Sequence, residues 1–589
     1  MSRNKLLVSS LMLALSFTAK AQTSSIHFGA KDNWFLERLE IKAGTNNDLN
    51  LSTVKPYLRK PYVEVADSLR ALLIDGKNPA NLTPIDQYNL NRFQSNNKEY
   101  SRYTNDDFKD WKNEKKFLRA FFPTKGNAIE INENDFFMTV NPVFGGQIGK
   151  ETDNDKRMFL NTKGLAIRGL IAKKIAFDLF VTDNQERGPM QFRQMQAMYH
   201  QVPGAGYFKR FNQSADDFMI NGDGASVYTG AVDYLESRGS VSTNVTKYVN
   251  LQFGYDKNFI GDGYRSLFLG NFSNNNLFFK INTRIWKLNY TNLFMELNPS
   301  FTRAGDRLLD KKYATMHHLS VNVTKWLNVG VFESVMFGRY NRFDFSYMLP
   351  VIFYRSIEQQ NGSPDNANVG FNFKANIAQS FQVYGQLMLD ELNIKEITKD
   401  RTWWGNKNGT QLGIKYVDVA KIKNLDLQLE WNRVRPYTYS HRDSTSNYIH
   451  YNMPMAHPLG ANFNEVIGVL RYQPMNKLYL TAKVIAYKQG VDTMGTNYGS
   501  NPNKPYNGSN RTPILYNGTM QNTYGYQVGT GVLRQTAFAS FLASYELFEN
   551  MFVELNASYR RFKQSNVTTS NTNFNVGLRW NIGRREYDY

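Results

Sequence analysis

From about residue 134 to its end, this chain alternates apolar and polar residues with a period of two, the feature that most constrains its fold. Leu165, Ile167 and Ile171 belong to one such run, which ends at a short turn and resumes with Ile175. A period of two places successive side chains on opposite faces of a strand. Short turns alternate with long polar loops, which is typical of membrane barrels rather than soluble β-sandwiches. The pattern predicts an all-β fold, a transmembrane antiparallel β-barrel.

The alternating runs pair into eight hairpins with one lone strand at each end, so we expect about eighteen strands. The hairpins are 165–171 with 175–181, 241–245 with 249–253, 277–281 with 288–294, 319–323 with 327–331, 371–375 with 381–389, 412–416 with 425–431, 466–472 with 478–486, and 541–545 with 551–559; the lone strands begin at 136 and 574. This even number predicts that both termini are periplasmic. Segment 343–357 also resembles a strand, but it would break the alternation, so we place it in an outer loop or folded inward.

Residues 1–21 have the pattern of a secretory signal peptide. A positive segment at 2–5 precedes an apolar run at 6–15, and Ala-Lys-Ala at 19–21 predicts cleavage after Ala21. No later apolar stretch is long enough for a membrane-spanning helix, and the mean hydropathy is −0.51, which excludes a helical membrane protein. The absence of cysteine excludes disulfides and thiolate metal sites. We therefore expect the bacterial outer membrane as the location.

Residues 22–130 differ from the alternating part and are expected to form a periplasmic, partly helical region, followed by the barrel at 131–589. Helical spacing over 61–74 gives an apolar side that includes Val65 and Leu69. A second helix is expected to begin at Thr83, where Pro84 suits the first turn. This region is predicted to fold against or into the barrel mouth; a swapped or disordered linker is the alternative.

The formal net charge of +19 could indicate nucleic acid as a partner, but the export signal argues against it. The expected partners are outer-membrane lipid, lipopolysaccharide and an acidic surface polysaccharide. Alternatively, Lys and Arg only solvate the barrel interior and rim. The aromatic last strand, ending at Trp580 before a charged tail at 584–589, is typical of what the barrel assembly machinery recognises.

Aromatic and basic residues in the predicted outer loops are the candidates for a glycan-binding site, because aromatic rings pack on sugar rings while polar groups bond hydroxyls. The candidates are Arg339, Tyr340, Arg401, Trp403, Trp404, Tyr437, Tyr439, Arg442, Tyr451 and His457. The alternative for each residue is the ordinary interfacial aromatic belt and charged rim of a barrel.

No sequence motif indicates an enzyme, a metal site or a cofactor. His441, Asp443 and Ser444 are close in sequence but form no recognised catalytic pattern, and the few histidines lack a tight ligand spacing. We expect a protein without enzymatic activity, metal or cofactor.

Several stretches resemble the capsule-assembly outer-membrane proteins called Wzi, and more closely their Bacteroidetes relatives that include the gliding-motility protein RemB. The resemblance rests on 254–267, with the turn Gly261, Asp262, Gly263, Tyr264 and Arg265, and on 451–452, 456–463, 135–143 and 390–391. It implies an eighteen-stranded barrel with a periplasmic helical region and a non-enzymatic role in holding surface polysaccharide, within capsule assembly or gliding motility. The alternatives left open are a channel or transporter with a helical plug, and a barrel phospholipase.

Overall fold

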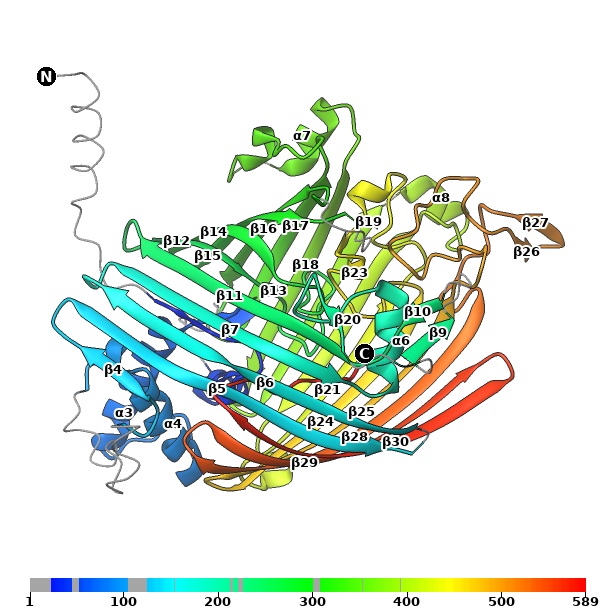
Figure 1. The fold of residues 1–589 in the computed structure, drawn as a ribbon. Coiled ribbons are helices and arrows are strands. Elements are labelled where there is room, and N and C mark those ends of the chain that lie inside the picture. The colour runs from blue at the N-terminus through cyan, green and yellow to red at the C-terminus, as the bar shows by residue number, and fades with distance from the viewer. Residues whose placement is uncertain are drawn as a thin grey trace, which may run out of the picture.

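The computed structural model describes residues 23–44, 52–103, 124–152, 154–211, 214, 217–220, 226–299, 308–351, 353–391 and 393–589. The predicted signal peptide lies outside these residues. Eighteen long antiparallel strands close into a barrel, as the alternation predicted (Figure 1). The short strands β4 and β8 extend this sheet by pairing with β5 and β11. Within the described ranges no helix has the length and apolar character needed to cross a membrane.

The barrel strands follow one another in chain order around the wall. They are β5 (Phe136–Glu151), β6 (Asn154–Ile171), β7 (Ile175–Arg187), β11 (Val232–Asn244), β12 (Val249–Asp256), β14 (Asn276–Ile285), β15 (Leu288–Leu297), β16 (Lys312–Asn322), β17 (Leu327–Phe337), β18 (Asn366–Ile377), β19 (Phe381–Glu391), β20 (Lys407–Tyr416), β21 (Leu425–Val434), β24 (Phe463–Met475), β25 (Leu478–Val491), β28 (Val532–Phe548), β29 (Met551–Gln564) and β30 (Val567–Trp580). The barrel closes where β30 pairs with β5.

Smaller elements lie inside the barrel or in its loops. The helices are α2 (Lys31–Ala43), α3 (Arg59–Ile74), α4 (Pro84–Asn96), α6 (Met190–Tyr199), α7 (Tyr354–Gln360) and α8 (Ile394–Lys399), with short 3-10 turns that include η5 (Phe345–Met348). The short strands are β1 (Ser25–Ile26), β2 (Val54–Lys55), β3 (Tyr57–Leu58), β4 (Ile129–Asn132), β8 (Lys209–Arg210), β9 (Phe218–Ile220), β10 (Ser226–Tyr228), β13 (Phe259–Ile260), β22 (Ile449–His450), β23 (Met453–Pro454), β26 (Ile514–Tyr516) and β27 (Thr519–Gln521).

The barrel wall is apolar outside and largely polar inside, apart from an internal apolar cluster in which Met316 and Phe332 of the wall pack with Phe268. On β7, Asp178, Thr182 and Asn184 are buried toward the interior, whereas Leu179 between them is 43% exposed. The apolar residues that carried the predicted alternation are largely exposed, as Val484 and Leu555 illustrate at 56% and 59%. An outward apolar face with a polar interior is the arrangement that a lipid bilayer requires of a barrel.

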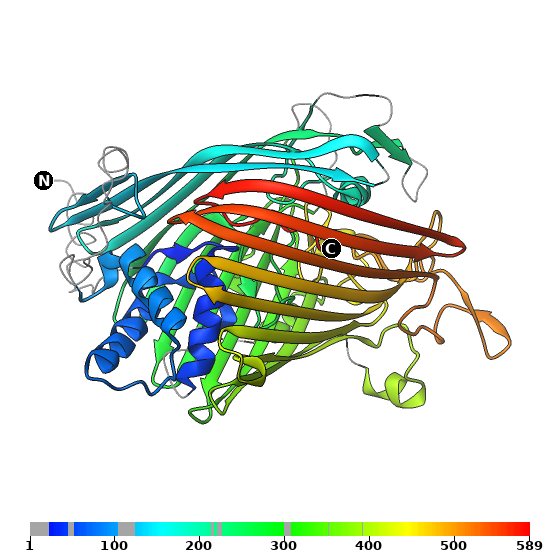
Figure 2. The ribbon, with the colours of Figure 1, turned by 90° about the horizontal axis from the view of Figure 1, so that it is seen from below.

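Two of the three N-terminal helices agree with the sequence analysis. The first is α3, and the second, α4, begins after Thr83, whose hydroxyl accepts a hydrogen bond from the Asp86 N–H in a capping box. The preceding α2 was not anticipated. Its charged residues Arg38, Glu40 and Lys42 are buried against the polar interior, so its sequence lacks the clean apolar side that identifies an amphipathic helix. All three helices lie at one end of the barrel (Figure 2).

The N-terminal segment continues deep into the barrel. Beyond α2, strand β2 pairs with β13 in the loop after β12, so that Val54 lies opposite Ile260. On the other side, Arg38 forms ion pairs with Asp86 (2.7 Å), Asp418 (2.7 Å) and Asp426. Helix α2 and residues 52–55, which include β2, therefore belong to a plug held by the barrel wall.

The end of the chain also lies inside the barrel (Figure 1). After β30, residues 584–589 turn back into the interior, where the Tyr587 hydroxyl donates to Glu186 on β7 (2.7 Å) and Asp588 pairs with Lys483 on β25 (2.6 Å). The prediction that the C-terminus lies in the periplasm is wrong, because the polar interior offers partners for this charged tail.

The loops follow the predicted asymmetry with two exceptions. At their outer ends β5 and β6 stay paired as far as Glu151 and Asn154, and the turn at 565–566 between β29 and β30 is as tight as the inner turns. Segment 343–357 does not span: it contains η5 and the start of α7 and lies in an outer loop, as predicted. The alternative that it folds inward is wrong, because Tyr354 packs on His317 of the outer wall.

Candidate functional site

Three outer loops that are distant in sequence meet at one end of the barrel. Loop 392–406 contacts loop 492–531 where the Trp404 N–H donates to the Thr523 carbonyl (3.0 Å), and loop 435–462 joins them where the Tyr437 N–H donates to the Gly499 carbonyl (2.9 Å). Gly499 has a φ of +76°, and a Cβ there would lie 2.3 Å from the Tyr437 nitrogen. Glycine therefore permits this close approach.

Aromatic and basic side chains gather at this junction, which we call the loop platform: Trp403, Trp404, Tyr437, Tyr506, Arg511 and Tyr526. The Trp404 ring lies 4.9 Å from the Tyr506 ring, and the Arg511 guanidinium lies 3.9 Å above Trp404. Trp404 and Tyr506 are half-buried, so each offers part of its ring to solvent. The platform combines exposed aromatic surface with a cation.

Buried residues hold the platform in shape. The Arg435 Nε donates to the Asn406 carbonyl (2.6 Å), and its Nη2 donates to the Tyr526 carbonyl (3.0 Å). The Tyr437 hydroxyl donates to the Asn497 carbonyl (2.7 Å). His441 packs near Tyr506 (5.9 Å between rings), and burial, followed by nearby Lys407 and Arg442, lowers its pKa to about 4. The imidazole is therefore neutral at physiological pH.

Five predicted candidates belong to the platform or its edge, among them Trp404 itself. Trp403 is buried beneath Trp404, with 5.7 Å between ring centroids, and Tyr437 is fully buried. Arg401 and Arg442 are exposed in the contributing loops. The sequence analysis missed Tyr506, Arg511 and Tyr526. Their loop was recognised as long and polar, but its many turn-forming residues gave no sign of which side chains would reach Trp404.

Other candidates have structural contacts. The Tyr439 hydroxyl donates to the Leu267 carbonyl (2.8 Å) in the core, and buried His457 bonds to Glu465 (2.7 Å). Tyr451 is half-buried, and its N–H donates to the Asn298 carbonyl (3.2 Å), at a different loop contact. These three residues are not brought to the exposed part of the platform.

Arg339 and Tyr340 lie in the separate loop after β17. Arg339 binds Asp365 through two hydrogen bonds (2.7 and 2.6 Å), which orders that loop. The side chain of Tyr340 is fully exposed. This pair therefore contributes to the outer surface without joining the platform.

The turn at 261–265 is a junction inside the barrel. Asp262 accepts a hydrogen bond from the Thr53 hydroxyl (3.0 Å) of the plug and pairs with Lys374 (3.1 Å). The Tyr264 and Arg265 N–H groups donate to Glu430 (2.6 and 3.0 Å) on the wall. Both side chains also contact Asp588 of the C-terminal tail. This turn therefore connects plug, wall and tail, a role that its glycines alone did not indicate.

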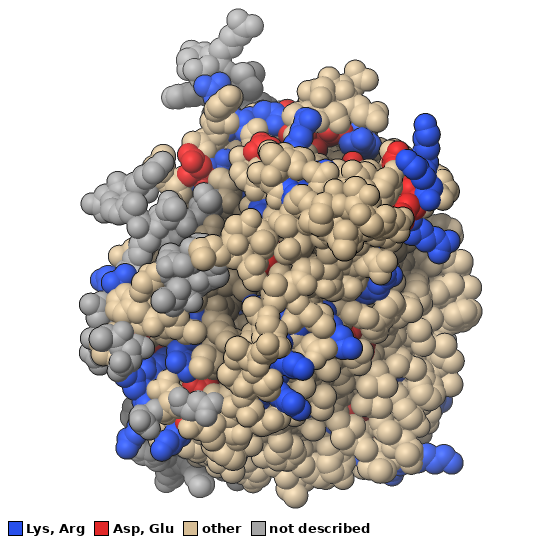
Figure 3. Space-filling view, turned by 90° about the vertical axis from the view of Figure 1, so that its right-hand side faces the viewer, with Lys and Arg blue, Asp and Glu red and all other residues tan. Residues whose placement is uncertain are grey.

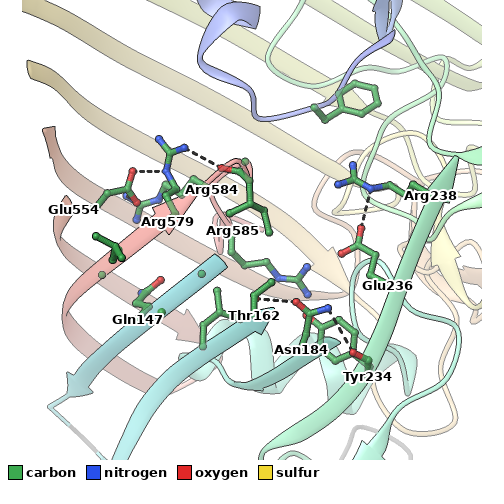
Figure 4. Close-up of a pocket in the computed structure, with 18 residues that line it drawn as sticks. Gln147, Thr162, Asn184, Tyr234, Glu236, Arg238, Glu554, Arg579, Arg584 and Arg585 are labelled. Carbon is green, nitrogen blue, oxygen red and sulfur yellow. Dashed lines mark hydrogen bonds and ion pairs between the residues drawn. The ribbon is translucent and has the colours of Figure 1, made fainter. Parts of the chain in front are cut away.

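A polar cavity of about 150 Å³ remains between the tail and the wall (Figure 4). The side chains of Arg238, Arg579, Arg584 and Arg585 line it. Glu236 pairs with Arg238 (3.4 Å) and Glu554 pairs with Arg579 (2.7 Å). The cavity can hold several water molecules or a small anion, but it is too small for a polysaccharide. The plug, the 261–265 turn and the tail therefore fill much of the interior.

The outer face around the platform is mostly uncharged, with scattered Lys and Arg and fewer Asp and Glu side chains (Figure 3). Within the described residues, no group of three or more His, Asp or Glu side chains is arranged to hold a metal ion. The platform is therefore suited to binding by ring packing, hydrogen bonds and cationic contacts.

Eighteen strands with an apolar exterior, an internal plug and closed-over outer loops define the class of this protein as an outer-membrane β-barrel. A model of the capsule assembly protein Wzi family matches residues 237–576, more than half of the chain. The chain belongs to this family.

One solved structure supports the fold, and a second is reported only as a weaker match. The Escherichia coli Wzi structure, described as an outer-membrane carbohydrate-binding β-barrel involved in group 1 capsule assembly, matches with 13% identity and a TM-score of 0.53, over 96% of this chain and 100% of that one. Pseudomonas aeruginosa OprD matches with 9% identity and a TM-score of 0.39, over 75% of this chain and 94% of that one. No curated protein matches the chain by sequence.

Proposed function

We propose that this protein is a non-enzymatic outer-membrane barrel that binds surface polysaccharide and holds it at the cell surface. The observation that carries the proposal is the platform, where Arg511 lies over Trp404 and Tyr506 lies beside it. Half-exposed rings can pack on sugar rings, and Arg511 with exposed Arg401 and Arg442 can pair with acidic sugars. Membership of the Wzi family supports the same role.

The filled interior supports a surface role over transport. Lys374 pairs with Glu40 of the plug (3.0 Å) and with Asp262 of the turn (3.1 Å). These contacts bind the plug in addition to the ion pairs of Arg38. A barrel with a fixed plug offers no continuous wide path for a polymer. We therefore place polysaccharide binding at the outer loops.

The resemblance to the RemB branch extends the proposal to surface motility, in which the held polymer would take part in gliding. Lipopolysaccharide is the expected neighbour in the outer leaflet, and the barrel assembly machinery the expected partner during insertion. Secretion would depend on the signal peptide, with cleavage after Ala21. Residues 22–130 would then form the periplasmic, partly helical region and 131–589 the barrel.

Binding of the extracted surface polysaccharide of the producing bacterium to the purified barrel tests the proposal. We expect W404A to weaken binding about tenfold, which corresponds to about 1.4 kcal/mol. The matched control is W286A, because Trp286 is 79% exposed but lies in the turn between β14 and β15 at the opposite end. Failure of the wild-type protein to bind, or equal loss in both variants, would contradict the proposal.

A further inference from the structure

Part of the long loop after β17 lies against the outside of the barrel. We call residues 343–351 and 353–360 the flap; they include η5 and α7. The Tyr354 ring lies 3.9 Å from the His317 ring on β16, and the Arg355 N–H donates to Glu333 on β17 (3.0 Å). The Tyr290 hydroxyl on β15 donates to the Pro350 carbonyl. The flap is therefore fastened to three neighbouring strands.

Strand register identifies the covered face as the outer one. Leu319 and Val331 are 37% and 43% exposed and lie opposite each other in the β16–β17 pairing. His317 and Glu333, two residues further along each strand, also lie opposite each other and share that face. The flap thus covers two polar side chains that would otherwise face the bilayer.

The other face of the flap is strongly apolar and exposed. Phe345, Val351 and Phe353 are 75%, 85% and 79% exposed, and Met348 and Leu349 lie among them. Such a cluster in water is unfavourable, because each exposed square ångström of apolar surface costs about 25 cal/mol. Since the flap lies on the membrane-facing wall, the outer-leaflet lipid is the apolar phase that this face meets.

A hollow in the same wall adjoins the flap. It has room for about 610 Å³ and is lined mainly by aliphatic and aromatic side chains, among them Leu288, Leu319, Val331, Phe371, Leu387 and Leu412. Leu319 pairs in register with Tyr290, the residue that holds the flap. Gly385 lies on the outward face between Phe373 and Leu412, and a Cβ there would approach the Phe373 ring to 2.7 Å. The missing side chain helps to form the hollow.

We propose that the flap and the hollow form a binding site for a lipid A-type glycolipid of the outer leaflet. One acyl chain occupies the hollow, and the neighbouring acyl chains of the same lipid cover Val351 and Phe353. The phosphates lie near exposed Arg342 and near Arg355, which also pairs with buried Glu358 (2.7 Å) but keeps 54% of its side chain exposed. A phosphorylated glycolipid matches both features, the apolar hollow and the arginines, and it is an outer-leaflet molecule.

Native mass spectrometry of the full-length barrel, purified in mild detergent and incubated with lipid A, tests the site. We expect one lipid A molecule to remain on the wild-type protein, and V331W, which fills the hollow, to lower its occupancy at least fivefold. V484W is the matched control, because Val484 is similarly exposed on the outer wall of β25, away from the hollow. It should retain lipid A like the wild type.

A second variant tests the head group without altering the wall. R342Q/R355Q should reduce lipid A occupancy while leaving retention of phosphatidylethanolamine, offered in a parallel incubation, unchanged and low. An unfolding midpoint in detergent equal to that of the wild type shows that each variant is folded. The proposal is overturned if the wild-type protein retains no lipid A, if V331W and V484W behave alike, or if phosphatidylethanolamine is retained as well as lipid A.

Discussion

Asp588, the penultimate residue of the chain, accepts a hydrogen bond from Lys483 Nζ at 2.6 Å inside the barrel. Burial raises the pKa of Asp588, but Lys483 and Arg265 outweigh it and hold that pKa below its usual value. The Asp588 carboxylate is therefore ionised, and Lys483 and Arg265 balance its charge. Through Lys483 and Arg265 the tail is joined both to the wall and to the 261–265 turn.

Substitution of this carboxylate tests how much the tail stabilises the barrel. We expect D588N to destabilise the protein by about 3–5 kcal/mol, because it leaves buried cations without their partner. E586Q is the control: Glu586 also pairs with Lys483 (2.9 Å) but is 47% exposed, so its loss should cost less than about 1 kcal/mol. Unfolding midpoints in detergent measure both; equal midpoints for D588N and wild type would contradict this role.

The attachment of the plug depends on pH. Burial raises the pKa of Asp86 and of Asp418, but Arg38 and Lys42, together with backbone hydrogen bonds, outweigh it, so both pKa values lie below the usual 3.8. A lowered carboxyl pKa contributes stability that is complete above the unfolded value and is lost as pH falls through the folded one. The stabilisation should therefore be full at pH 7 and decline below about pH 4.

R38M measures this contribution directly. We expect it to destabilise the barrel by about 3–5 kcal/mol at pH 7, and by much less at pH 3, because three carboxylates lose Arg38 and only two of them, Asp86 and Asp418, still pair with Lys42. K60M, at an exposed pair with Glu64 (3.5 Å), should have little effect at either pH. Thermal unfolding at both pH values provides the comparison, and a difference between R38M and wild type that does not change with pH would refute the linkage.

The shape of the platform depends on one glycine. G499A should weaken polysaccharide binding at least tenfold, because its Cβ would displace Tyr437 and separate two of the three loops. In G495A the φ is +72°, similar to that at Gly499, but no atom lies within 4 Å of the added Cβ. That variant carries the same backbone strain without the collision and should bind normally. Equal binding by the two variants would mean that loop contact is unimportant.

The filled interior predicts a barrel that does not conduct. In planar bilayers we expect the wild-type protein to show no steady ion current, because plug, turn and tail occupy the interior. D262A should produce brief openings, since it removes the carboxylate that joins Thr53 to Lys374. E64A on the exposed side of α3 should remain closed. Steady current through the wild-type protein would favour a channel.

The barrel could be predicted because its signal is local and repeated. Every membrane strand must alternate apolar and polar residues. The outward orientation of Leu165 and Phe541 can therefore be predicted without knowing which strands lie beside them. Helix α4 carries its own start signal in Thr83 and Pro84. The tight outer turn at 565–566 could not be predicted from the sequence, because the length of a turn depends on where the two neighbouring strands end.

The interior and the platform could not be predicted in the same way. Arg38 looks like a surface residue until Asp418 and Asp426, almost four hundred positions away, are placed beside it. Trp404 was identified from its residue type, whereas Arg511 can be recognised as a site residue only from its contact with the Trp404 ring. Tyr439 and His457 had the right chemistry but point into the core.

Retention of polysaccharide on living cells tests the central claim most directly. Deletion cells are supplied with wild-type protein, with W404A/R511A, or with W286A at equal surface amounts, and cell-bound and released polysaccharide are measured. We predict that W404A/R511A releases most of the polymer into the medium, while wild type and W286A retain it. Normal retention by W404A/R511A would contradict the assignment of polysaccharide binding to the loop platform.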